Sequence, residues 1–255
     1  MSSPVFSEKI LDNYSYNEDG MTVNGSIGKY LLLNVILFVS AIASIVLFTG
    51  VDPLSSDVYG NQEMMKGFDR LSVLVVPIIA AVTVGLVIVF KPSLSPFLSI
   101  IYAIVEGIVL GVISAMSAYE TKGIVENALF ATFTVLFVML FLYRFRIIKA
   151  TQRFKSVVIG ATASISVFYI IMLGVSFFGI YPDWFYGSGN ISIGISAAVI
   201  IVAALNLILD FDFIEKGAEK HLPKYMEWYA AFGLMITIIW LYLEILRLLS
   251  KLNKR

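Results

Sequence analysis

The stretch AALNLILDFDFIEKGAEKHLPKYMEWYAAFGLMITIIWLYLEILRLLS, residues 203–250, decides how the rest of the chain is interpreted. Its pattern predicts an apolar helix that ends in acids, a short charged loop, and a long apolar helix with a glutamate near its far end. An ionised carboxylate surrounded by lipid costs several kcal/mol unless it is protonated, paired or hydrated. The positions of Asp210, Asp212 and Glu244 therefore need a physical reason, and proton-linked ion handling supplies one.

The composition indicates a membrane protein with several spans. Of the 255 residues, 59% are hydrophobic and only 14% are charged, whereas about a quarter of a soluble domain is charged. The formal net charge is zero, which gives no indication of a nucleic-acid partner. We expect the lipid bilayer to be the main surroundings of this chain.

The same composition excludes several kinds of functional site. The chain has no cysteine and a single histidine, His221, which lies in a charged loop. Disulfides, thiolate nucleophiles, Cys-ligated metals and His-rich metal cages are therefore excluded. The sequence also lacks a nucleophile elbow, a phosphate loop and the GxGD pattern of intramembrane aspartyl proteases. We expect no cofactor and no enzymatic activity.

Seven apolar stretches are long enough, or nearly long enough, to cross a bilayer. They lie at about 30–49, 71–90, 97–118, 127–143, 156–178, 190–209 and 225–248. The chain is thus predicted to be an all-α membrane protein, with a polar N-terminal tail at 1–28 and one transmembrane domain at 29–255. The tail lacks the basic start and apolar core of a signal peptide, and we expect it to be mostly disordered and cytoplasmic.

The distribution of lysine and arginine predicts an N-terminus inside the cell. With that orientation, the outer segments hold Lys66, Arg70 and Lys122. The inner segments hold Lys9, Lys29, Lys91, Arg144, Arg146, Lys149, Arg153, Lys155, Lys216, Lys220 and Lys224. The basic C-terminal tail opposes the rule, since seven crossings place it outside. We expect the last helix to cross nevertheless, because the earlier spans usually set the orientation.

Glu106 lies near the middle of the third span, in FLSIIYAIVEGIVLGVISAMSA. Two interpretations stay open for it. Glu106 is either a residue of an ion path or network, or a protonated acid that hydrogen-bonds a neighbouring helix as a structural link. Gly107 and Gly111, four residues apart, predict a face on which another helix approaches closely.

Asp210 and Asp212 point roughly 200° away from each other on a helix, so we expect only one of them to face the bundle interior. Asn206 lies one turn before Asp210 on the same face, and this polar stripe favours Asp210 as the inward residue. We expect Asp212 at the membrane surface, as a solvated helix end that pairs with Lys216 at i, i+4.

Two acids of the last span have simpler interpretations. Glu244 and Arg247 are spaced i, i+3, so either they neutralise each other near the outer headgroups or Glu244 serves as a gate. Glu227 precedes Trp228 and Tyr229 at the start of the span, and we expect it to be an interfacial residue.

The motifs YAIVEGIVLGVIS, LNLILDFDFIEKG and MEWYAAFGLMITIIWLYLEILRLLS (226–250) resemble the Bax inhibitor-1 family, also called the transmembrane Bax inhibitor motif proteins, and most of all its bacterial Bax inhibitor 1-like branch. The resemblance covers nearly the whole chain after residue 20. It implies seven transmembrane helices, with a central last helix wrapped by two three-helix brackets.

The resemblance also implies a pH-dependent calcium leak gated by two aspartates that share a proton. Two carboxylates a few ångströms apart in a dry site cannot both ionise, so one of them titrates near neutral pH. In this chain Thr237 stands where the second aspartate is expected, and Glu244 lies two turns further along the same face, about 10 Å away. The first aspartate maps to either Asp210 or Asp212.

These observations predict a cation leak in the bacterial inner membrane whose permeability depends on carboxylate protonation. Asp210 is the first candidate sensor and Asp212 the second. The candidate ion path or gate adds Glu106, Glu244, Thr237 and Asn206. No fixed metal site is predicted, but a calcium ion in transit would meet Asp210, since hard cations prefer oxygen ligands. The alternative is a membrane interaction protein that modulates a membrane protease or stress factor through residues 1–28 and the basic loop 144–155.

Overall fold

The computed structural model describes residues 20–49 and 70–254. Within them the chain forms eight α-helices and one 3-10 turn. These elements are α2 (Val23–Thr49), α3 (Arg70–Phe90), η2 (Pro92–Leu94), α4 (Ser95–Glu120), α5 (Ile124–Arg144), α6 (Gln152–Phe177), α7 (Asp183–Tyr186), α8 (Asn190–Glu219) and α9 (Met226–Asn253). Residues 1–19 of the predicted tail (1–28) and most of the segment 51–70, which we expect to be an external loop, lie outside the described residues.

The predicted seven-helix membrane fold is confirmed. Six helices in the described part of the chain are long and apolar enough to cross a membrane, namely α2, α4, α5, α6, α8 and α9. A shorter apolar helix, Leu74–Phe90 within α3, accounts for the seventh predicted span. A helix of 20 residues is about 30 Å long, close to the thickness of the hydrocarbon layer. The six long helices have 21 to 30 residues, so each is long enough to span that layer.

Helices α2 and α8 exceed the predicted apolar spans by the largest margins. Helix α2 begins at Val23, ahead of the predicted span. Helix α8 continues to Glu219, ten residues beyond the predicted end at 209. Asp210 and Asp212 therefore lie inside α8 rather than at its end. Hydropathy marks only the part of a helix that lipid surrounds, whereas the helix itself continues as long as its polar side chains find partners.

The described residues fall into two compact units. The α2–α4 unit runs to Val125 and includes Gly217–Met235. The α5–α8 unit comprises Glu126–Lys216 and the chain from Ile236 onward. Each unit thus contains part of α9, which is the most enclosed of the candidate spans. In α9 67% of the most apolar window is buried, against 11% in α6.

Two glycines of α4 allow this helix to pack closely against α2. A Cβ atom at Gly107 would lie 2.5 Å from the carbonyl oxygen of Leu37, and one at Gly111 would lie 2.1 Å from the hydroxyl of Ser44. Only glycine permits so close an approach of α2 to α4, so the predicted small-residue face is confirmed. In the same unit, the ring of Tyr102 meets that of Phe232 edge-on at 4.9 Å, which joins α4 to the first part of α9.

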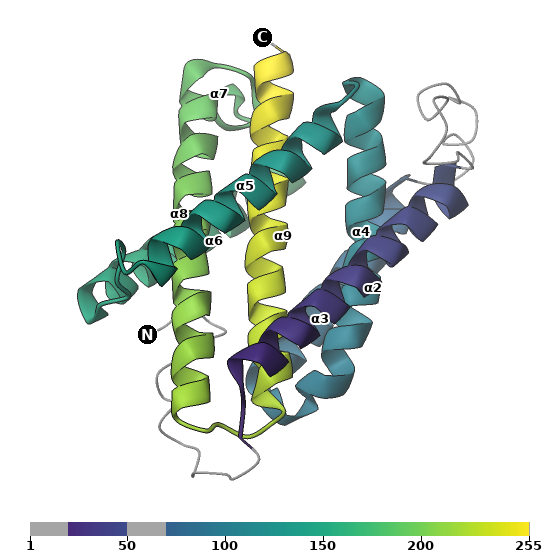
Figure 1. Ribbon diagram of the computed structural model, residues 1–255. Coiled ribbons are helices and arrows are strands. Elements are labelled where there is room, and N and C mark those ends of the chain that lie inside the picture. Colours follow the sequence, from purple (N-terminus) through teal and green to yellow (C-terminus); the bar gives the residue numbers. More distant parts are fainter. Residues whose placement is uncertain (1–19, 50–69, 255) are drawn as a thin grey trace. The chain divides into compact units, whose positions relative to one another are not determined.

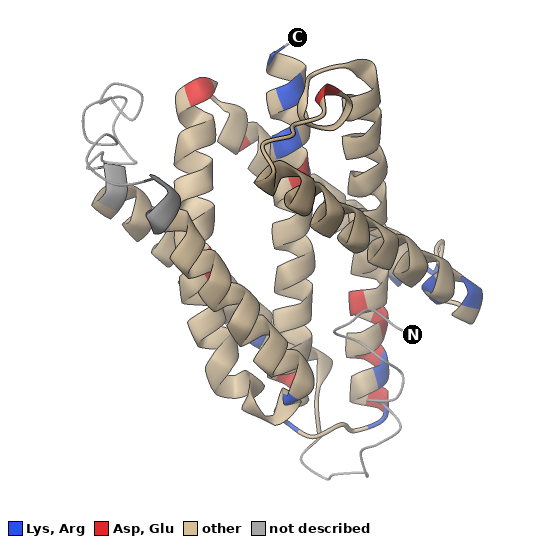
Figure 2. Ribbon diagram, turned by 180° about the vertical axis from the view of Figure 1, so that it is seen from behind, with Lys and Arg blue, Asp and Glu red and all other residues tan. Residues whose placement is uncertain are grey.

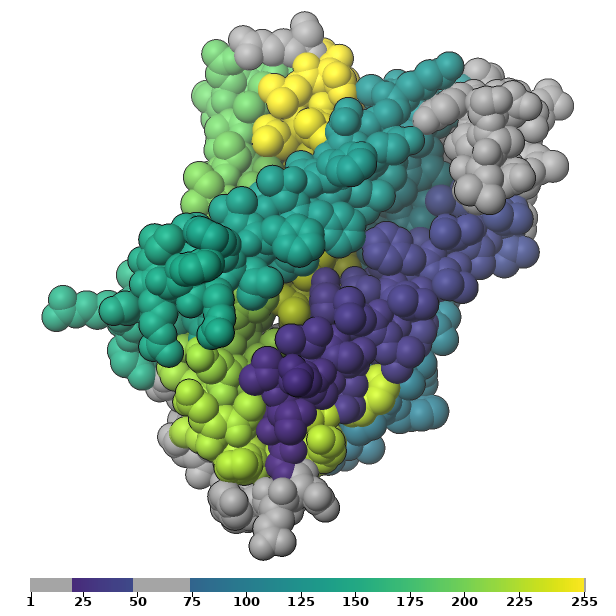
Figure 3. All heavy atoms as spheres, in the orientation of Figure 1, coloured from purple at the N-terminus to yellow at the C-terminus, as the bar shows by residue number. Residues whose placement is uncertain are grey.

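In the α5–α8 unit, helices cover α8 on two faces. Figure 1 shows α5 crossing in front of α8, and Figure 2, seen from behind, shows α6 crossing on the other side. Acidic and basic residues gather in the last turns of α8 (Figure 2). In the space-filling view the side chains of α5 lie over α8 (Figure 3). Side chains on opposite faces of α8 can therefore both be buried.

Candidate functional site

Asp210 is a buried carboxylic acid with an unusual environment. The residue is only 3% exposed. The side chain of Thr237, on α9, is hydrogen-bonded to its carboxyl group. The second carboxyl oxygen, Oδ2, has no hydrogen-bond partner among the described residues, and no lysine or arginine of that part of the chain pairs with it. Buried polar atoms are nearly always hydrogen-bonded, so this oxygen is an exception that needs an explanation.

The family resemblance aligns Thr237 with a second aspartate, and in the structure the Thr237 side chain is hydrogen-bonded to Asp210. Its hydroxyl can donate to a carboxylate or accept from a carboxylic acid. A threonine does not titrate, so the pair holds one exchangeable carboxyl proton where two aspartates would share it.

Asn206 is buried one turn before Asp210, as the polar stripe on α8 predicts. Its side-chain amide nitrogen donates to the hydroxyl of Thr162 at 2.7 Å and to the carbonyl oxygen of Val202 at 2.8 Å. Both donor positions are therefore used on α6 and on its own helix. Asn206 fixes α6 against α8 at the level of the candidate site, and it gives no hydrogen bond to Asp210.

Asp212 is neutralised by two lysines. Its Oδ2 atom lies 2.8 Å from Nζ of Lys155 and 2.9 Å from Nζ of Lys216. The predicted i, i+4 pair with Lys216 is confirmed. The predicted solvated helix end is wrong, because Asp212 is only 8% exposed. The expectation that only one of the two aspartates faces inward is wrong for the same reason: Lys155, on α6, covers the second face of α8.

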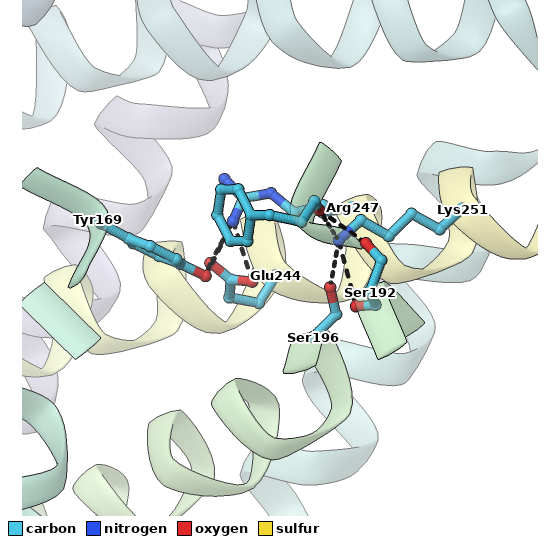
Figure 4. Close-up of polar contacts among 7 residues, drawn as sticks. Tyr169, Ser192, Ser196, Glu244, Arg247 and Lys251 are labelled. Carbon is cyan, nitrogen blue, oxygen red and sulfur yellow. Dashed lines mark hydrogen bonds and ion pairs between the residues drawn. The ribbon is translucent and has the colours of Figure 1, made fainter. Parts of the chain in front are cut away.

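Glu244 is also buried and paired. Its Oε1 atom accepts a hydrogen bond from the hydroxyl of Tyr169 at 2.8 Å and lies 3.1 Å from Nη1 of Arg247. Figure 4 shows this cluster between α6 and α9. The predicted i, i+3 ion pair is therefore present. Asp210, Thr237, Asn206, Asp212 and Glu244 all belong to the α5–α8 unit.

Glu106 belongs to the α2–α4 unit, where it is half-buried. Its carboxyl group makes no hydrogen bond and no ion pair with any residue that the structure describes. The structural interpretation of Glu106, as an acid bonded to a neighbouring helix, is thus not found there. The close contact of α4 with α2 comes from the adjacent glycines instead.

Sequence reasoning missed the most completely enclosed acid, Glu227. It is 0% exposed, an enclosure by other side chains that its place beside Trp228 and Tyr229 did not indicate. Its carboxylate is paired with Lys29 and with Lys224, the latter at 2.9 Å. The backbone nitrogen and the hydroxyl of Thr22 each donate to its Oε1 atom at 2.9 Å. The i, i+3 spacing to Lys224 was a visible signal, but the contacts with Thr22 and Lys29 span about two hundred residues of sequence.

No group of three or more Asp, Glu and His side chains in the described part of the chain is placed to hold a metal ion. A cation that reached Asp210 would find few protein ligands, and water would have to complete its coordination.

Comparison with known proteins agrees with the fold and the motifs. The sequence model of a family described as Bax inhibitor 1 like matches residues 3–254. No curated protein and no solved structure gives a significant match. The family match covers nearly the whole chain, and the apolar helices fit a chain that crosses the membrane several times. The chain is therefore a multi-pass membrane protein that belongs to the Bax inhibitor 1 like family.

Proposed function

We propose that the protein is a passive cation leak of the bacterial inner membrane, with its N-terminus in the cytoplasm, and that the protonation of Asp210 sets its permeability. Calcium is the cation that the carboxylate chemistry and the family resemblance favour. One observation carries the proposal: the Asp210 carboxyl is buried, and its Oδ2 atom has no partner among the described residues. The proposal assigns no catalytic step to the protein.

The physical argument rests on the difference between the two forms of this carboxyl. The neutral acid is tolerated in an apolar site, whereas an ionised carboxylate without a cation is costly there. Ionisation therefore favours any change that admits water or a cation to Asp210. Asp212 lacks this property, because Lys155 and Lys216 already neutralise it.

Thr237 makes the proposed switch a single-carboxyl one. Its hydroxyl bonds Asp210 in either protonation state and contributes no proton of its own to the titration. We therefore expect permeability to follow a simple one-proton curve rather than the two-step curve of a coupled pair.

The test is calcium flux into liposomes that hold the purified protein, measured with a trapped calcium dye from about pH 5 to about pH 8. In the Asp210→Asn variant, flux should no longer depend on pH, because the amide that replaces the carboxyl does not titrate. Glu126→Gln is the matched control, since Glu126 is an exposed acid in the same unit. An Asp210→Asn protein with unchanged flux and unchanged pH dependence would refute the assignment.

A second variant tests the one-proton curve. Thr237→Asp places a second carboxyl beside Asp210, and the two groups cannot both ionise cheaply. The pH midpoint of flux should move by about one unit or more, and the curve should broaden into two steps. An unchanged midpoint would show that Thr237 does not contact the titrating group.

The alternative function, a membrane protein that modulates a partner protein, is favoured by the segment between α5 and α6. Arg146 and Lys149 are exposed in that segment, and so are Arg144 at the end of α5 and Arg153 at the start of α6. Deleting residues 1–20 is expected to abolish a partner-dependent role and to leave ion flux intact. Comparing flux with partner activity in that deletion separates the two functions.

A further inference from the structure

A pocket of about 390 Å³ lies in the α5–α8 unit. It is bounded by the second half of α6, by α7, and by the last turns of α9. Its lining residues are Tyr169, Met172, Leu173, Phe185, Tyr186, Arg247 and Lys251. The volume is within the range of small-molecule sites. Two of the seven lining residues are cations and none is an acid, which is unusual for a pocket between apolar helices.

Lys251 brings a buried positive charge to this pocket. The residue is 7% exposed. Its Nζ atom donates to the carbonyl oxygens of Phe185 and Ser192, at 3.1 and 3.3 Å, and to the hydroxyl of Ser196 at 2.9 Å (Figure 4). All three acceptors are neutral, and the face of the Phe185 ring lies 5.6 Å from Nζ, so no carboxylate forms an ion pair with this ammonium group in the described part of the chain. A buried charge usually has a counterion, because leaving it alone is costly.

Arg247 adds free donors beside that charge. Only its Nη1 atom is used, for the hydroxyl of Tyr169 at 2.9 Å and for Glu244. Its Nε and Nη2 atoms make no hydrogen bond within the described residues, and 43% of the side chain is exposed. Glu244 supplies one negative charge while Arg247 and Lys251 supply two positive ones, so this cluster keeps one positive charge. Guanidinium and ammonium donors side by side suit a phosphate group.

The side chains around the pocket favour a phospholipid as the source of such a phosphate group. Leu173 lines the pocket, and Ile170 and Phe177 share its face of α6 at helical spacing. These three side chains are 69%, 66% and 90% exposed in chain order, so they form an apolar strip suited to an acyl chain. The pocket lies toward the C-terminal end of α9, and a helix of 28 residues is about 42 Å long, enough to extend from the hydrocarbon layer into the headgroups.

We propose that this pocket binds the phosphate of an anionic phospholipid, with Arg247 giving it hydrogen bonds and Lys251 the balancing charge. The glycerol and headgroup fill the rest of the pocket, and an acyl chain follows the apolar strip on α6. The site is independent of Asp210, so its failure would leave the proposed leak untouched.

The test measures the thermal unfolding temperature of the full-length protein in nanodiscs. One set contains phosphatidylcholine alone, and the other contains phosphatidylcholine with phosphatidylglycerol. Phosphatidylglycerol should raise the unfolding temperature of the wild type and of Lys149→Gln, a control that removes one exposed charge in the same unit. The rise should be lost in Lys251→Gln.

A second variant separates hydrogen-bond geometry from net charge. Glu244→Gln with Arg247→Gln removes one charge of each sign, so the net charge stays the same while the guanidinium donors are lost. The rise with phosphatidylglycerol should be lost here too. Because each variant is compared with itself in the two lipids, a general loss of stability does not imitate the result.

Inorganic phosphate added to the protein in neutral detergent distinguishes a lipid source from a free one. A rise with phosphatidylglycerol but none with inorganic phosphate supports the lipid. An equal rise with inorganic phosphate, lost in Lys251→Gln, supports the phosphate site but overturns the lipid as its occupant. An equal rise with phosphatidylglycerol in all variants, or none in the wild type, overturns the site.

Discussion

Two buried carboxylates in this protein have opposite surroundings. Glu227, at the start of α9, is held by two lysines and by two donors of Thr22. Asp210, in α8, has a threonine and an oxygen without a partner among the described residues. The first environment stabilises a permanent charge. The second accommodates a charged carboxylate only when water or a cation enters the site. Burial alone therefore does not identify a functional acid, and the groups around it decide.

The surroundings of Glu227 also include a close contact between helices. Gly25 lies against Glu227, so that a Cβ atom there would be 2.2 Å from its Oε1 atom. Both residues belong to the α2–α4 unit, where the segment from Met21 to Lys29 also bonds the loop before α9: the backbone nitrogen of Met21 donates to the carbonyl oxygen of Leu222 at 2.6 Å. The Glu227 cluster thus joins the start of α2 to the start of α9 through ion pairs and hydrogen bonds.

The largest effect on stability is expected for Glu227→Gln. The amide keeps the shape but leaves Lys29, whose side chain is 19% exposed, without its partner. Removing one member of a buried ion pair costs about 3–5 kcal/mol, and the measurement is thermal unfolding in detergent. The double variant Lys29→Gln with Glu227→Gln should recover part of the loss. If the single variant is as stable as the wild type, Glu227 does not stabilise the contact between α2 and α9.

A smaller effect is expected for Gly25→Ala. The added methyl group must displace a carboxylate that four donors hold in place, and overpacking of this kind costs about 1–3 kcal/mol. Gly28 is the matched control, because it is in the same helix and, apart from the nearby backbone of that helix, no described atom lies within 4 Å of the position of its Cβ. Gly28→Ala should be neutral or slightly stabilising. Equal unfolding temperatures for the two variants would contradict the close contact at Gly25.

The smallest effect on stability is expected for Asp210→Asn, within about 1 kcal/mol of the wild type. The carboxyl gives up no ion pair, and an asparagine oxygen can still accept a hydrogen bond from Thr237. The measurement is thermal unfolding of Asp210→Asn and of Glu227→Gln under the same conditions, which gives the loss of stability at each acid. A loss at Asp210 as large as the loss at Glu227 would reveal a charged partner and would remove the basis of the proposed switch.

Much of the fold could be predicted from sequence because its signals are local. The seven apolar stretches have the length of a bilayer crossing, and Gly107 and Gly111 mark the close contact on α4. The pairs Asp212–Lys216 and Glu244–Arg247 follow from helical spacing alone. The extent of α8 beyond residue 209 could not be predicted in this way, since hydropathy falls where charged residues begin, even when the helix continues.

The sequence by itself determined the membrane class, the number of spans and the acids that needed an explanation, because bilayer thickness and helical periodicity act on neighbouring residues. Only the tertiary structure decided which groups surround each acid. Lys155 reaches Asp212 across 57 residues, Tyr169 reaches Glu244 across 75, and Lys29 reaches Glu227 across 198. Whether a buried carboxylate is neutralised or left to titrate depends on such distant partners, and no spacing along the chain reveals them.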